Sequence, residues 1–91
     1  MEEKFIWLFY GIGGSFASGV FETKDLAEEW IKENSLYGTL TKYPVNKGIY
    51  NWAIEKGYFT ITKEYQVEGG FIQKFTSASQ EHYHYECGFK D

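Results

Sequence analysis

Six consecutive apolar residues, Phe5 to Tyr10, constrain the fold of this 91-residue chain more than any other segment does. Alternate side chains of an extended strand point to opposite faces, so this strand is apolar on both faces. Such a strand belongs inside a sheet, with a neighbour on each side and cover on both faces. The segment is too short to be the core of a signal peptide or a membrane span.

The residues that follow predict a β-hairpin and then a helix. The glycine-rich segment 11–15 is expected to form a turn, and residues 16–22 are expected to return as the second strand. Thr23 is a favourable N-cap for a helix that runs to about Asn34. The apolar residues of this helix share one stripe that should face the core: Leu26, Ala27, Trp30 and Ile31.

The second half of the chain is less regular. A third strand is predicted from Leu36 to Tyr43, and a second short helix from Asn46 to Lys56, with Gly57 as its C′ residue. Residues 58–67 fit a strand or a loop, and residues 68–70 should break any regular element. Residues 71–78 fit a helix as well as a strand, so the structure of Thr60 to Ala78 stays open. A last strand is predicted from Glu81 to Cys87.

Together these elements predict a single α+β domain over residues 1–91. We expect a small single-layer sheet, antiparallel or mixed, with two short helices in the order ββαβα, followed by a C-terminal strand or hairpin. Aromatic side chains make up 21% of the residues. The favoured explanation of this content is core filling in so short a chain, and the alternative is an exposed aromatic surface that receives a partner or ligand.

The charge of the chain excludes several classes of partner. The formal net charge is −4, and the sequence contains no run of basic residues. A nucleic-acid surface needs clustered cations, as does a helix that lies on an anionic membrane, so neither kind of partner is expected. A single cysteine agrees with a reducing compartment, and we therefore expect a cytoplasmic protein.

The segment before the C-terminus contains both histidines and the single cysteine of the chain. In a strand, His82, His84 and Glu86 share one face, whereas Cys87 points to the other. This alternation separates the thiol from both histidines, so no cysteine nucleophile and no catalytic residue are predicted. The segment is nevertheless the best candidate for binding, and the residues we predict for this role are Glu81, His82, Tyr83, His84, Tyr85 and Glu86.

Two hypotheses from different classes follow for this segment. In one, its aromatic and carboxylate side chains bind an unknown protein partner. In the other, His82, His84 and Glu86 hold a divalent metal or a small ligand. The chain has no third histidine, so a further metal ligand would have to come from another carboxylate or from water.

Several distinctive segments occur together in this chain. They are Trp7-Leu8-Phe9, Phe16-Ala17-Ser18-Gly19-Val20-Phe21, Ala27-Glu28-Glu29-Trp30-Ile31, Leu36-Tyr37-Gly38-Thr39-Leu40-Thr41, Tyr50-Asn51-Trp52-Ala53-Ile54 and Ser77-Ala78-Ser79-Gln80-Glu81-His82-Tyr83-His84-Tyr85-Glu86. In these segments the chain resembles a small bacterial family of unknown function over nearly its whole length. The resemblance implies a bacterial origin and a shared fold.

The sequence therefore favours a small acidic cytoplasmic protein that acts as a non-enzymatic interaction module. Toxin-neutralising immunity proteins and accessory regulators are analogous in size and charge alone. The alternative is a metal-binding or ligand-binding protein that uses His82, His84 and Glu86. A symmetric homodimer is a further expectation, because a strand that is apolar on both faces needs cover on both.

Overall fold

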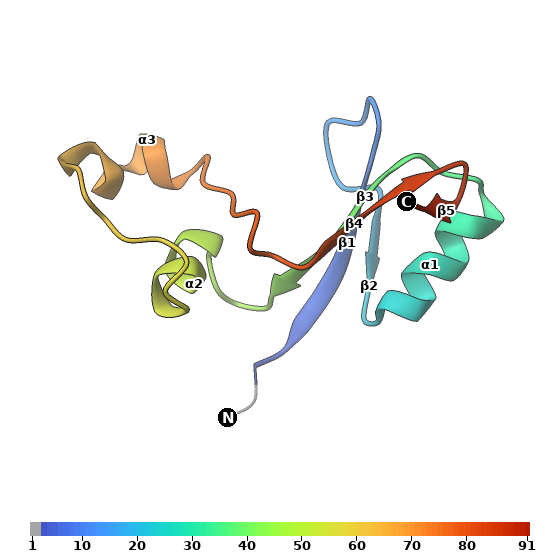
Figure 1. The fold of residues 1–91 in the computed structure, drawn as a ribbon, viewed down its shortest axis with the longest axis horizontal. Helices are drawn as coiled ribbons and strands as arrows, with labels where there is room; N and C mark the ends of the chain where they lie inside the picture. The colour runs from blue at the N-terminus through green and yellow to red at the C-terminus, as the bar shows by residue number, and fades with distance from the viewer. Residues whose placement is uncertain (1–2) are drawn as a thin grey trace. The chain divides into compact units, whose positions relative to one another are not determined.

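The computed structural model describes residues 3–91, which form two compact units (Figure 1). The first unit takes in the described residues up to Val45 together with Gln80–Asp91, and the second is Asn46–Ser79. The first unit contains the sheet and the longest helix, and the second contains three short helical segments.

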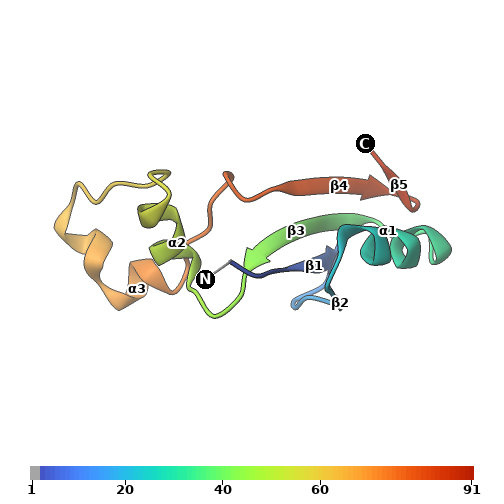
Figure 2. The ribbon, with the colours of Figure 1, turned by 90° about the horizontal axis from the view of Figure 1, so that it is seen from below.

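The first unit is built on a five-stranded sheet in which every neighbouring pair is antiparallel. In their order across the sheet the strands are β2 (Gly19–Phe21), β1 (Phe5–Gly11), β3 (Gly38–Pro44), β4 (His82–Glu86) and β5 (Phe89–Lys90). Strands β1, β3 and β4 lie side by side (Figure 2). The structure confirms the α+β class, the placement of β1 between two neighbours and the C-terminal hairpin.

Helix α1 (Lys24–Glu33) lies on one face of this sheet (Figure 1). Its start is as predicted, because the Thr23 hydroxyl accepts a hydrogen bond of 3.2 Å from the Leu26 N–H. Ala27 and Ile31 are buried against the sheet. The prediction that Leu26 also faces the core is wrong, since its side chain is 52% exposed. Leu26 lies at one edge of the predicted stripe, whereas the fully buried Ala27 and Ile31 lie toward its other edge.

The core of the first unit lies between α1 and the sheet. Its buried residues are Trp7, Phe9, Ala27, Ile31, Leu40 and Tyr85. Trp30 closes one side of it, with its ring centroid 5.9 Å from that of Phe9 and 5.4 Å from that of Phe21. Gly19 leaves room for these rings, because a Cβ atom there would lie 2.7 Å from the Phe21 ring.

The second strand is shorter than the predicted span 16–22, because the connection from β1 is a wide loop. The Ile12 N–H donates to the Tyr37 carbonyl and the Ser18 N–H to the Phe9 carbonyl, both at 2.9 Å. Sheet pairing therefore resumes only at Gly19, opposite Phe9. Residues in the loop are open to solvent, and Phe16 is 82% exposed.

The second unit contains α2 (Ile49–Glu55), the 3₁₀ helix η1 (Glu64–Val67) and α3 (Gly69–Ile72). Helix α2 starts later than the predicted Asn46. That residue has a left-handed backbone with φ of 62°, and Gly48 occupies the N-cap position instead. Gly57 has a φ of 80° beyond the end of α2, which agrees with its predicted C′ role.

A cluster of aromatic rings forms the interior of the second unit. The buried ring of Tyr50 has its centroid 5.9 Å from that of Phe59, 6.3 Å from that of Phe71 and 5.6 Å from that of Phe75. The Tyr50 hydroxyl donates a 2.7 Å hydrogen bond to the Gln66 backbone carbonyl. The polar end of this buried ring is therefore satisfied within the unit.

The side chain of Gln66 holds the loop that precedes η1. Its Oε1 atom accepts hydrogen bonds from the backbone N–H groups of Thr62, at 2.7 Å, and Lys63, at 2.9 Å. Because Gln66 is itself buried, these bonds fix the loop against the aromatic cluster. The segment that the sequence left open is thus ordered by one buried amide and several rings, with no strand among its described residues.

Candidate functional site

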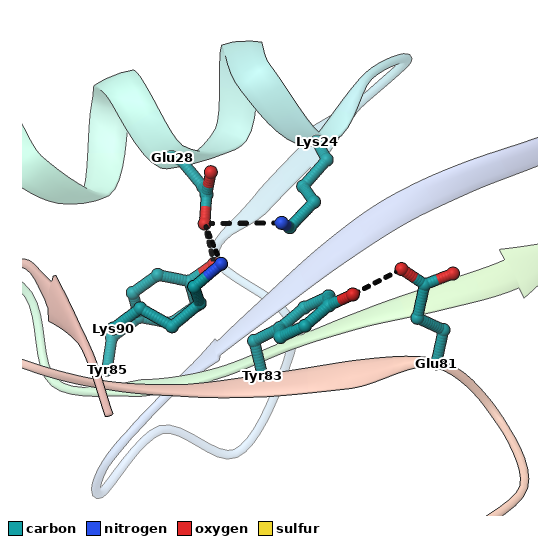
Figure 3. Close-up of polar contacts among 6 residues, drawn as sticks. All are labelled: Lys24, Glu28, Glu81, Tyr83, Tyr85 and Lys90. Atoms are coloured by element: carbon teal, nitrogen blue, oxygen red, sulfur yellow. Dashed lines mark hydrogen bonds and ion pairs between the residues drawn. The ribbon is translucent and has the colours of Figure 1, made fainter.

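Strand β4 divides the predicted binding segment between the two faces of the sheet. Tyr83 and Tyr85 point toward α1 (Figure 3). His82, His84 and Glu86 occupy the alternate positions and belong to the opposite face. The predicted residues therefore form two separate groups with different surroundings.

On the face covered by α1, Glu28 collects three polar groups (Figure 3). The Tyr85 hydroxyl donates a hydrogen bond of 2.6 Å to Glu28 Oε2. The same oxygen lies 3.8 Å from Lys24 Nζ and 3.7 Å from Lys90 Nζ. Burial of Tyr85, reinforced by the bond to Glu28, raises the pKa of this phenol well above its ordinary value. The contacts tie α1 to the C-terminal hairpin.

Tyr83 lies beside this group and contacts the same lysines. Lys24 Nζ is 4.2 Å and Lys90 Nζ 4.8 Å from the centre of the Tyr83 ring, which is a cation–π geometry. The Tyr83 hydroxyl donates to Glu81, and this hydrogen bond raises the pKa of the phenol. These charged and phenolic groups are paired with one another, so we interpret them as a structural clamp. Its residues are Lys24, Glu28, Glu81, Tyr83, Tyr85 and Lys90.

The two histidines on the opposite face are exposed and each is oriented by one hydrogen bond. His82 Nδ1 lies 2.7 Å from the carbonyl oxygen of Gln80, so this nitrogen is the donor. His84 Nδ1 lies 3.2 Å from the Thr39 hydroxyl. The ring centroids of His82 and His84 are 5.5 Å apart, with the rings nearly perpendicular.

The predicted three-ligand metal set is not assembled in the structure. Within residues 3–91, no group of three or more His, Cys, Asp or Glu side chains is placed to hold a metal ion. His82 and His84 are neighbours, but Glu86 does not complete a site with them.

The cysteine lies outside the strand, contrary to the predicted span 81–87. Strand β4 ends at Glu86, and Cys87 with Gly88 forms the two-residue turn of the β4–β5 hairpin. Both turn residues have a positive φ, of 50° and 84°, which is typical of a type I′ turn. Gly88 is required there, because a Cβ atom would lie 3.0 Å from the Cα atom of Lys32.

The histidines form part of a larger surface, which we call the open face. It comprises the strand residues that point away from α1: Ile6, Leu8, Tyr10, Val20, Thr39, Thr41, Tyr43, His82, His84, Glu86 and Phe89. In the sheet register Leu8 lies between Val20 and Thr41, and Thr41 lies opposite His82. Among the described residues of the first unit, no helix covers this face.

A pocket in the second unit escaped the sequence analysis. It has a volume of about 590 Å³, and its lining residues are Tyr65, Glu68, Gly70, Phe71, Lys74, Phe75 and Thr76. The i, i+4 spacing of Phe71 and Phe75 was a signal for this region, but it also fitted other structures. The contact between the rings of Tyr65 and Phe71, with centroids 5.6 Å apart, has no counterpart in a sequence pattern.

Comparison with models of protein families gives a match over most of the chain. The model of a family described as a domain of unknown function, DUF7710, matches residues 6–91. No curated protein shows a significant match to the chain, and neither does any solved structure. In the described part of the chain, none of the helices has the length and apolar character that crossing a membrane requires.

Proposed function

The chain belongs to the DUF7710 family of domains of unknown function, and from the geometry of its sheet we propose that it is a non-enzymatic module that binds a protein partner. The open face is the surface that we assign to this partner. His82, His84 and Glu86 lie on it, whereas Glu81, Tyr83 and Tyr85 act on the other side as the structural clamp.

One observation carries the proposal, namely that the strand residues of the open face include a single charged side chain, with Asp91 beside His84 at the margin of the face. Charged residues make up 24% of the chain, yet Glu86 is the one Asp, Glu, Lys or Arg among the strand residues of this face. Exposed surface of a small protein is ordinarily rich in such residues. Depletion of charge together with exposed aromatic side chains, here Tyr10 and Phe89, is typical of the centre of a protein interface.

The short edge strands of the sheet favour the open face, and not the sheet edges, as the surface that binds the partner. One edge strand, β2, has three residues, and the other, β5, has two. Very short edge strands disfavour the addition of a further strand, although β1 and β4 extend beyond them. A partner that used this unit would therefore gain more from side chains on the open face than from extending the sheet.

We also place the protein in the cytoplasm. Cys87 is an exposed free cysteine, and a free thiol on the surface is more compatible with a reducing compartment than with an oxidising one. Immunity proteins and accessory regulators are analogous in size and charge, and this analogy is the reason for expecting a protein as the ligand.

A lysine placed on the open face tests the proposal. Val20 is 62% exposed on β2, so Val20→Lys should fold normally while introducing a charge that a closed interface would have to desolvate. Leu26→Lys is the matched control, because Leu26 is 52% exposed on α1 and lies outside the open face. The measurement is the amount of co-purifying protein that each tagged variant retains from its native host, with sedimentation of each purified chain.

We expect Val20→Lys to lose the partner that the wild type and Leu26→Lys retain. If the partner is a second copy of the chain, sedimentation should show a dimer for the wild type and Leu26→Lys and a monomer for Val20→Lys. Equal retention or equal association by all three proteins would contradict the proposal.

A further inference from the structure

The pocket of the second unit has aromatic walls from two neighbouring elements and the segment after them. Tyr65 comes from η1, Phe71 from α3, and Phe75 from the segment that follows. The Tyr65 and Phe71 rings meet at 76° with centroids 5.6 Å apart, and the Phe71 and Phe75 rings meet at 57° with centroids 5.9 Å apart. Rings inclined in this way present both faces and edges to a group in this open pocket, which suits a planar aromatic ligand.

Two residues of opposite charge, Glu68 and Lys74, are among those that line the same pocket. Both residues are exposed, and they do not form an ion pair with each other. Neither side chain has a hydrogen bond or ion pair with another residue in the described part of the chain. The pocket therefore offers one anion and one cation that are free to meet a ligand.

We propose that this pocket binds a zwitterionic aromatic amino acid. The aromatic ring of the ligand lies against Phe71 and Phe75, its ammonium group faces Glu68, and its carboxylate faces Lys74. A volume of about 590 Å³ is within the range of small-molecule sites. The inference is independent of the protein-binding role of the open face, since it rests on different residues in the other unit.

The lining also argues against other classes of small ligand. Besides Glu68 and Lys74, Tyr65 and Thr76 are the lining residues with a polar group in the side chain, and each has one hydroxyl. A sugar or a nucleotide needs several hydrogen-bonding partners, and burying its polar groups without them is costly. A ligand with one ring and two terminal charges matches the groups that the pocket provides.

Three small molecules test the proposal as a matched set. Phenylalanine carries both charges, 3-phenylpropionate carries only the carboxylate, and phenethylamine carries only the ammonium. Each is titrated into the full chain labelled with ¹⁵N, and the amide signals of Gly70 and Thr76 report binding at the pocket. We expect phenylalanine to bind about fivefold more tightly than either of the others, the effect of one exposed ion pair.

Two variants assign each preference to a residue. Glu68→Gln should abolish the preference for phenylalanine over 3-phenylpropionate, which lacks the ammonium, and should keep the preference over phenethylamine. Lys74→Gln should abolish the preference over phenethylamine, which lacks the carboxylate, and should keep the preference over 3-phenylpropionate. Glu64→Gln is the control, because Glu64 lies in η1 and does not line the pocket. Both pocket residues are exposed, so these substitutions should leave the fold intact, which the ¹⁵N spectrum of each variant checks.

Three results would overturn the proposal. The first is no shift of the Gly70 and Thr76 signals with phenylalanine at millimolar concentration. The second is equal affinity for the three compounds, which would show an apolar pocket without a role for the charges. The third is a preference that Glu68→Gln and Lys74→Gln leave unchanged.

Discussion

At the scale of single residues, the hydrogen bond from the Tyr85 hydroxyl to Glu28 joins two positions that are 57 residues apart in the sequence. Tyr85→Phe should lower the free energy of unfolding by about 2 kcal/mol, because a hydrogen bond to a charged group is lost at a buried site. Urea denaturation measures this difference. Tyr10→Phe is the control, since Tyr10 is exposed on the open face, and equal stability of the two variants would contradict the clamp.

The same residue predicts how stability changes with pH. The pKa of Tyr85 is raised in the folded protein, so its phenol keeps the proton at pH values where an unfolded tyrosine loses it. The contribution of Tyr85 to the free energy of unfolding is complete below a pH of about 10, the ordinary tyrosine pKa. This contribution is lost as the pH rises toward the pKa of the folded state.

Stability measured by urea denaturation should therefore fall above pH of about 10, and less steeply in Tyr85→Phe. The hydrogen bond to Glu81 also raises the pKa of Tyr83, and burial raises that of Tyr43. The stability of Tyr85→Phe should therefore still fall with pH, but less steeply than that of the wild type. Identical slopes for the wild type and Tyr85→Phe would rule out this role for the Tyr85 hydroxyl.

Gly38 is a second residue on which the sheet depends. A Cβ atom at this position would lie 2.1 Å from the Tyr10 carbonyl oxygen and 2.8 Å from the Phe9 ring. Gly38→Ala should therefore destabilise the protein by about 3 kcal/mol, because β1 and β3 must move apart. Gly69→Ala is the control, since a Cβ atom there has nothing within 4 Å. Thermal unfolding of the pair checks the prediction, which fails if both variants melt together.

At the scale of elements, the ring of Trp30 packs α1 against Phe9 and Phe21 of the sheet, beside the buried Ala27 and Ile31. Trp30→Ala removes the contacts with Phe9 and Phe21 and should cost about 3 kcal/mol. Leu26→Ala, on the exposed side of the same helix, should cost less than about 0.5 kcal/mol. Chemical denaturation of both variants tests the packing, and a change below about 1 kcal/mol for Trp30→Ala would show that this ring is not part of the core.

Elements with a strong local signal were predictable from the sequence. The apolar run that became β1, the Thr23 cap of α1 and the Gly57 position after α2 all depend on residues within a few positions of one another. The limits of β2 were not predictable, because loop hydrogen bonds such as that from Ile12 to Tyr37 decide where pairing resumes.

The candidate sites depended on contacts that no local pattern contains. Strand alternation predicted the separation of His82 from Tyr83, but the position of Glu28 over Tyr85 is a tertiary contact. The pocket of the second unit likewise depends on ring contacts such as that between Tyr65 and Phe71, which periodicity does not describe.

At the scale of the whole molecule, charge is distributed unevenly over a chain of net charge −4. Lys24, Glu28 and Lys90 concentrate charge between α1 and the C-terminal hairpin, while the open face carries Glu86 alone among its described strand residues. Stability and binding are thereby assigned to opposite sides of one sheet, so substitutions should affect them separately.

Partner retention by the double variant His82→Gln/His84→Gln tests this division most directly. Both side chains are exposed, so the free energy of unfolding of the variant should lie within about 0.5 kcal/mol of that of the wild type. The variant should nevertheless retain far less partner from an extract of its native host. Undiminished retention would contradict the assignment of the open face. So would a wild-type protein that purifies with stoichiometric zinc and loses it, with the associated stability, in the double variant.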